Sequence, residues 1–123
     1  MMSCLFDSLA TFVSDSSPEI RQRVCDYIGA NKPLMDGIAT DKLFDAVYTA
    51  KMRNRSTWGG AAEIQAACMI YNISVVITSL RPSDRLNKPI VFLPLQRKLN
   101  TARVYLYWDG GHYTPAPVRL VGI

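Results

Sequence analysis

The sequence predicts an α+β domain in which helices pack on a small, twisted, mainly antiparallel β-sheet. Apolar residues recur at helical spacing through most of the first 71 positions, and the β-branched run at 73–78 then begins a series of strand-like segments. Helices followed by strands are typical of an α+β arrangement. The 123 residues are enough for one core and too few for two, so we expect a single domain over 1–123.

The first two helices carry recognisable start signals. Three apolar residues of the first helix recur at i, i+4 and i+7, which predicts a buried face: Leu5, Leu9 and Phe12. Ser3 is a candidate N-cap that would place Cys4 in the first turn. The segment 16–19 combines serine, proline and an acidic first turn, and it therefore predicts a second helix that ends near Gly29.

Two further helices are expected before the sheet. Thr40 and Asp41 start the third, whose apolar line is Leu43, Phe44, Val47, Tyr48 and Met52. The fourth runs from Ala61 to Tyr71 and is rich in alanine, so we expect it to pack closely in the middle of the domain. Glu63 lies in its first turn, where the helix dipole favours a carboxylate, and a capping role is its simplest interpretation.

The strands are expected at 73–78, 89–93 and 103–108. The first is apolar and β-branched, as in a buried strand, and the second is followed by a proline that favours an edge position. Alternation along the third places three residues on one face: Val104, Leu106 and Trp108. The turn sequence at 109–111 predicts a hairpin, and 118–121 is expected to add a last short strand.

Composition and charge exclude several classes of protein. With 49% hydrophobic and 20% charged residues the chain is not typical of disordered proteins, and no apolar run approaches the roughly 20 residues that span a bilayer. The amino terminus lacks a secretory signal pattern. The net charge of +4 is spread over scattered residues with small clusters at 51–55 and 97–98, so we expect an ordinary solvated or partner-facing surface rather than a nucleic-acid site.

The three cysteines cannot all pair within the chain, which favours a reducing, intracellular compartment. Cys25 and Cys68 lie in helical, apolar stretches and are interpreted as core residues. With a single histidine there is no zinc-ligand pattern, so we expect neither a metal nor a cofactor.

Cys4 and His112 form a candidate chemical pair. A thiol in the first turn of a helix can have a lowered pKa, and an imidazole can hold the proton of the thiol and later pass it to a leaving amine. His112 is the only histidine and follows a late strand. The alternatives are an inert, buried cysteine and an ordinary surface histidine.

Three blocks of residues resemble the ovarian tumour (OTU) family of cysteine proteases, especially its compact viral members. The blocks are Cys4-Leu5-Phe6 with Ser8-Leu9, Trp58-Gly59-Gly60 with Glu63-Ile64, and 104–113 ending in Trp108-Asp109-Gly110-Gly111-His112-Tyr113. The resemblance implies an OTU-like fold and hydrolysis of the bond after the Gly-Gly terminus of ubiquitin or a ubiquitin-like modifier. For a viral member it also implies cleavage of a polyprotein. The partner would then be that modifier, and the chain a monomer or a domain of a larger polyprotein.

The resemblance assigns roles to individual residues. Cys4 becomes the nucleophile and His112 the general base and then acid, while the Cys4 amide and the preceding loop would form the oxyanion site. Four residues would line a narrow substrate channel that admits glycine: Trp58, Gly59, Trp108 and Tyr113. For the aromatic residues Trp58 and Tyr113, the alternative is packing in the core or in a loop.

The chain departs from the family pattern in two places. Met1-Met2-Ser3 stands where the family usually has Asp-Gly-Asn before the cysteine, so we expect the loop that supplies the oxyanion site to be missing, altered or truncated. Thr114 occupies the position of the acid or asparagine that orients the histidine. A threonine hydroxyl accepts from an imidazole but does not stabilise imidazolium as a carboxylate does. Thr114 is therefore a weak third member, Asp109 is a weak alternative that also suits a turn former, and a Cys–His dyad is a further possibility.

Three functional interpretations follow. The chain is an active deubiquitinase, an OTU-like domain with impaired chemistry that binds ubiquitin, or a globular interaction domain in which Cys4 and His112 are unrelated.

Overall fold

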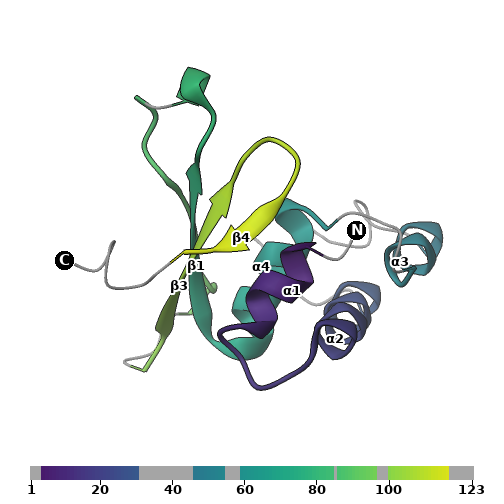
Figure 1. The fold of residues 1–123 in the computed structure, drawn as a ribbon. Coiled ribbons are helices and arrows are strands. Elements are labelled where there is room, and N and C mark those ends of the chain that lie inside the picture. Colours follow the sequence, from purple (N-terminus) through teal and green to yellow (C-terminus); the bar gives the residue numbers. More distant parts are fainter. Residues whose placement is uncertain (1–3, 31–45, 55–58, 85, 97–99, 117–123) are drawn as a thin grey trace.

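A computed structural model describes residues 4–30, 46–54, 59–84, 86–96 and 100–116. The helices are α1 (Cys4–Ala10), α2 (Ser17–Gly29), α3 (Ala46–Met52) and α4 (Ala61–Tyr71), with a short 3₁₀ helix, η2 (Pro82–Asp84). The strands are β1 (Ile73–Ser79), β2 (Ile90–Phe92), β3 (Ala102–Trp108) and β4 (Tyr113–Pro115). The labelled helices lie to one side of the sheet, with α1 and α4 next to it and α2 and α3 further out (Figure 1). This arrangement confirms the predicted α+β class.

The sheet has the strand order β2-β1-β3-β4. Its two outer ladders are antiparallel, as expected, whereas the central ladder between β1 and β3 is parallel and runs from the pair Ile73–Ala102 to the pair Ser79–Trp108. Strand β2 pairs with one edge of β1 and runs antiparallel to it. The chain then crosses to the other edge of β1, where β3 runs in the same direction as β1, and β4 follows through the predicted hairpin.

The predicted start of the second helix is confirmed, whereas Ser3, the predicted cap of the first, lies outside the described residues. The Ser16 hydroxyl accepts from the Glu19 amide at 3.4 Å, and Glu19 Oε1 accepts from the Ser16 amide at 3.0 Å, which forms a reciprocal cap at the start of α2. Helix α4 has the predicted bounds and is buried along most of its length. Helix α1 ends at Ala10, earlier than the apolar pattern suggests, and Phe12 packs on the core just beyond its end.

One prediction about α3 is wrong. Val47 was expected on the apolar line of this helix but is 70% exposed, whereas Met52 is 5% exposed. Among the described elements, helix α3 packs mainly against α2, and Val47 is left exposed. The expected start of the helix at residues 40–44 and the expected strand at 118–121 lie outside the described residues.

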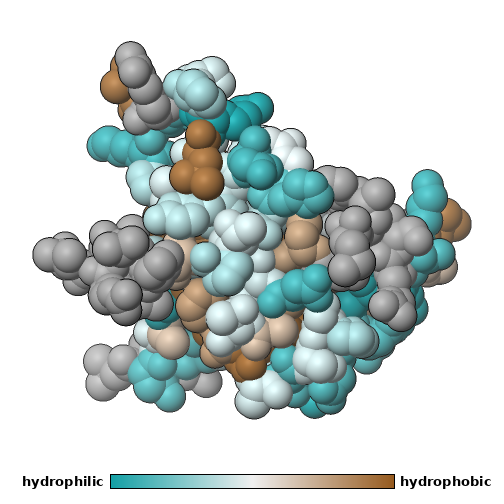
Figure 2. All heavy atoms as spheres, viewed as in Figure 1, coloured by the Kyte–Doolittle hydropathy of each residue, from teal (hydrophilic) through white to brown (hydrophobic). Residues whose placement is uncertain are grey.

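The core lies between the sheet and helices α1, α2 and α4. Its buried members are Leu5, Phe6, Leu9, Ile20, Val24, Ile28, Ile64, Ala66, Ala67, Cys68, Ile73, Val75, Ile77, Val104 and Leu106. Trp108 packs against this cluster on the same face of β3, as its alternation predicts. In the same view, hydrophobic residues show between sheet and helices, and hydrophilic ones cover much of the outer surface (Figure 2).

The cysteines are all free thiols, and Cys25 and Cys68 are fully buried, which confirms that both are core residues. Among the described helices, none is both long enough and apolar enough to cross a membrane.

Candidate active site

Cys4 is the first residue of α1 and is half-buried. The two residues that follow it anchor the helix start, because Leu5 and Phe6 are 1% and 0% exposed. The thiol is therefore carried by a segment whose position is determined by core packing, while it keeps contact with the surface.

Ser8 connects this helix to the strand that follows His112. The Ser8 hydroxyl, one turn after Cys4, donates to the carbonyl oxygen of Cys4 at 2.8 Å and to that of Tyr113 at 3.0 Å. Ser8 is 3% exposed, so this shared hydrogen bond is shielded from water. Helix α1 lies beside β4 (Figure 1), and the structure thus brings the segments of Cys4 and His112 together although they come from opposite ends of the sequence.

His112 lies at the end of the β3–β4 turn and is exposed. Asp109 shapes this turn: its Oδ1 accepts from the amides of Gly111 at 2.9 Å and His112 at 2.8 Å. These two amides hold the pKa of the Asp109 carboxyl below its usual value. Gly110 has φ of +106°, a conformation that side chains disfavour. Asp109 therefore acts as a turn former, and its role as an orienting residue for the imidazole stays a prediction.

Tyr113 faces the helices. Burial raises the pKa of its phenol, and the charges of Cys4 and Glu63 act in the same direction. The phenol is thus within electrostatic reach of the first residue of α1 and the first turn of α4. Thr114 is exposed, pairs with Tyr107, and lies on the opposite face of the strand because successive residues alternate.

Gly59 packs directly on α1. A Cβ at this position would lie 2.7 Å from Leu5 Cδ2 and 3.1 Å from the Phe6 ring, so only glycine fits without a shift of these buried side chains. Trp58 lies outside the described residues. Trp108 is half-buried against the core, with the Arg81 guanidinium 4.6 Å above its ring. The substrate-channel roles of these three residues stay predictions.

Comparison with known proteins identifies the family. A family model described as OTU-like cysteine protease matches residues 3–113. The chain belongs to this family. The ubiquitin thioesterase OTU1 of Mus musculus is 31% identical over 121 residues, which cover 92% of this chain and 33% of that protein. The chain thus spans about a third of the length of this relative.

Solved structures support the OTU fold. An OTU domain in complex with ubiquitin matches with a TM-score of 0.67 and 21% identity, over 92% of this chain and 62% of that one. The viral OTU protease from Dera Ghazi Khan virus matches with a TM-score of 0.60 and 18% identity, over 92% and 72% of the two chains. Because mammalian and viral OTU proteins both match, the similarity is to the family in general, and the viral subtype stays a prediction.

The OTU domain also contains a buried arginine that sequence reasoning missed. Arg21 of α2 is 2% exposed, and its guanidinium lies 4.4 Å from the centre of the Phe6 ring. It donates to the carbonyl oxygens of Met52 at 2.7 Å and Asn54 at 3.0 Å, and so binds the end of α3 to the helix layer. One signal was present: Arg21 precedes Cys25 by one helical turn and therefore falls on the buried face of α2.

Glu63 has the capping role that its position predicts, and a second one. Its Oε1 accepts from the Gly60 amide at 2.7 Å, and its Oε2 accepts from the Tyr48 hydroxyl. Glu63 is 1% exposed, whereas its two partners are half-buried, so both bonds are partly buried. Burial and this bond raise the pKa of Tyr48 well above its usual value. Glu63 thereby joins α3, the start of α4 and the glycine segment beneath α1.

Proposed function

We propose that this chain is a cysteine-type deubiquitinase that hydrolyses the bond after the Gly-Gly terminus of ubiquitin or a ubiquitin-like modifier. The observation that carries the proposal is the Ser8 junction, which holds the helix start of Cys4 beside the residue that follows His112. Membership of the OTU-like cysteine protease family supports it, as do a relative named ubiquitin thioesterase and an OTU domain solved with ubiquitin.

In the proposed mechanism, His112 takes the proton of the Cys4 thiol and the sulfur attacks the carbonyl carbon of the second glycine. The tetrahedral intermediate collapses to a thioester when imidazolium protonates the leaving amine. Water, deprotonated by His112, then attacks the thioester and releases the glycine carboxylate and the Cys4 thiol. The Cys4 amide is one donor available to the oxyanion.

The proposed substrate channel passes Tyr113. Its half-buried ring packs against the core, and its carbonyl oxygen is bonded to Ser8 of α1, so we expect a wide residue next to the scissile bond to compete with the ring for space. Trp58, Gly59 and Trp108 are proposed to complete this channel. We propose Thr114 as the third member of the site, because Oδ1 of the alternative, Asp109, already accepts two amides.

The test is turnover of a ubiquitin–fluorophore conjugate. We expect the wild type to release the fluorophore and the variants Cys4→Ala and His112→Ala to be inactive. Cys25→Ala is the matched control, since it removes a thiol that is fully buried in α2. Turnover that survives Cys4→Ala would exclude this cysteine as the nucleophile.

The same experiment separates the other interpretations. Binding of ubiquitin without turnover, measured by calorimetry, would identify an impaired, ubiquitin-binding OTU domain. If ubiquitin is neither bound nor turned over, the chain is an interaction domain with a different partner. Comparison of Thr114→Ala with Asp109→Ala assigns the third member: a modest loss only in Thr114→Ala supports Thr114, a loss only in Asp109→Ala supports Asp109, and full activity of both variants supports a dyad.

A further inference from the structure

We propose that Arg81 is a positioning residue for His112, acting through Trp108 and the turn between β3 and β4. The inference rests on the proposed function for its catalytic consequence. Arg81 follows β1 and belongs to none of the sequence blocks that resemble OTU proteases. Its side chain nevertheless packs on Trp108 and Gly110, which belong to the segment that leads to His112.

The guanidinium of Arg81 lies flat over the end of β3. Its central carbon is 4.6 Å from the centre of the Trp108 ring, a distance at which a cation is attracted to the aromatic face. A Cβ at Gly110 would be 3.1 Å from Arg81 Cδ, so the alkyl part of the arginine packs closely on the turn. The Leu80 amide, next to Arg81, donates to the Trp108 carbonyl at 2.8 Å.

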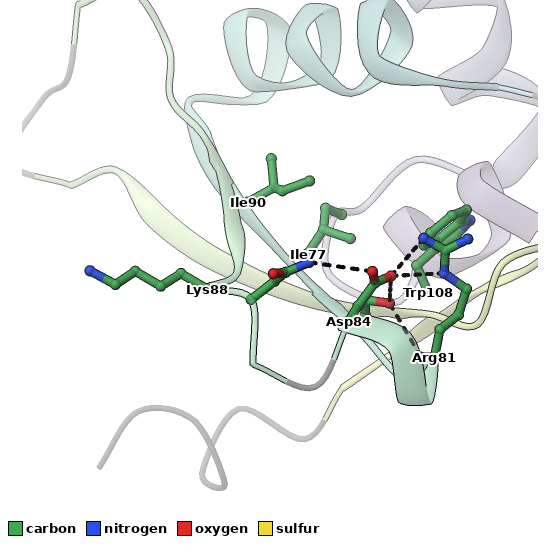
Figure 3. Close-up of a pocket in the computed structure, with 8 residues that line it drawn as sticks. Ile77, Arg81, Asp84, Lys88, Ile90 and Trp108 are labelled. Atoms are coloured by element: carbon green, nitrogen blue, oxygen red, sulfur yellow. Dashed lines mark hydrogen bonds and ion pairs between the residues drawn. The ribbon is translucent and has the colours of Figure 1, made fainter.

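Asp84 holds the arginine in this position. The Nε and Nη2 atoms of Arg81 each lie 2.7 Å from Asp84 Oδ2, which also accepts from the Ser79 hydroxyl at 2.7 Å. Figure 3 shows the arginine between Asp84 on one side and Trp108 on the other. The adjacent cavity of about 280 Å³ leaves the Arg81 side chain open on one side. Its placement therefore depends on these two contacts.

The consequence concerns the imidazole. The turn from Asp109 to His112 is short and is closed by the Asp109 carboxylate and by the bond from the Asp109 amide to the His112 carbonyl oxygen. The Arg81 side chain packs on this turn at Gly110. Loss of Arg81 removes this packing, so His112 should visit the reactive position less often, and small misplacements of a catalytic group strongly slow a reaction.

The experiment compares Arg81→Ala with Arg23→Ala. Arg23 is a suitable control because it is also exposed and is also held by one aspartate, with Nε 2.8 Å from Asp15 Oδ2 on the helix side of the molecule. We expect Arg81→Ala to lower kcat roughly five- to thirtyfold, with KM within about twofold, and Arg23→Ala to match the wild type. Arg81→Lys, which keeps the alkyl stem and the charge, should retain intermediate activity.

A second readout does not depend on turnover. His112 is the only histidine, so its ring-proton signals in an NMR spectrum are unambiguous. We expect these signals to shift and broaden in Arg81→Ala at constant pH, and to stay unchanged in Arg23→Ala. A variant that loses thermal stability with unchanged ring signals and wild-type kcat would show that Arg81 is only structural, and would overturn the proposal.

Two outcomes remain distinct. If Arg81→Ala fails to fold, Asp84→Asn, which keeps the arginine and weakens its anchor, must still reduce kcat and perturb the ring signals, and wild-type behaviour of that variant refutes the inference. If the wild-type chain has no turnover, the proposed function fails, whereas the ring signals still decide whether Arg81 positions the histidine.

Discussion

Replacement of Gly59 by alanine tests the contact that supports the helix of Cys4. The added methyl carbon would lie 2.7 Å from Leu5 Cδ2 and 3.1 and 3.2 Å from two carbons of the Phe6 ring. Carbon atoms in ordinary contact are about 3.5–4.0 Å apart, so Leu5 must move by roughly 1 Å. Leu5 and Phe6 are both buried and directly follow Cys4, which leaves movement of the helix start as the main way to relieve the overlap.

The expected loss of stability is about 1–3 kcal/mol, the usual range for an extra methyl group in a packed core. For a domain of this length the unfolding entropy is about 0.26 kcal/mol per kelvin, so Tm should fall by about 4–12 °C. We also expect kcat for the ubiquitin–fluorophore conjugate to fall, because the displaced segment carries the nucleophile.

The neighbouring glycine is the matched control. A Cβ at Gly60 would lie 3.7 Å from Glu63 Oε1, an ordinary contact, so Gly60→Ala should lose only about 0.5–1 kcal/mol through its weaker N-cap. A double-mutant cycle with Leu5→Ala tests the contact itself, since removal of Cδ2 should reduce the effect of Gly59→Ala. Equal stability of the two glycine variants, combined with additive effects in the cycle, would refute the reasoning.

Three further predictions concern the thiols and two buried polar side chains. Ser8→Ala should lose about 1 kcal/mol in a thermal melt and should lower kcat more than KM in steady-state assays; unchanged values in both would remove Ser8 from the site. Burial raises the pKa of Cys25 to about 11 and that of Cys68 to about 12, so both thiols stay protonated at pH 8. Mass spectrometry after iodoacetamide treatment should then find one adduct, on Cys4, and three in urea, whereas a second adduct on the folded protein would contradict this burial. Arg21→Met keeps the apolar contact with the core but removes the donor of two carbonyl oxygens, of which that of Met52 is buried, so urea denaturation should show a loss of about 1–3 kcal/mol; wild-type stability would argue against those bonds.

The sequence predicted which side chains of the candidate site could react, but not the contacts that hold them. Cys4 and His112 stood out because thiol hydrolysis needs these two side chains and the chain has a single histidine. That Asp109 closes the turn was one of two predicted roles, and the two amide bonds to its carboxylate favour it. The bridge from Ser8 to the Tyr113 carbonyl has no sequence signature, because it joins a side chain and a backbone atom from opposite ends of the chain.

The amino-acid sequence alone determined the local elements of this protein. These elements include the cap at Ser16, the bounds of α4 and the hairpin after β3. Each depends on residues within a few positions of one another, so the sequence itself predicts it. Only the tertiary structure decided that β1 and β3 run parallel, that Arg21 is buried, and that Gly59 lies against Leu5. These features depend on contacts between distant segments, which periodicity and propensity do not encode, and they determine how the segments of Cys4 and His112 are held.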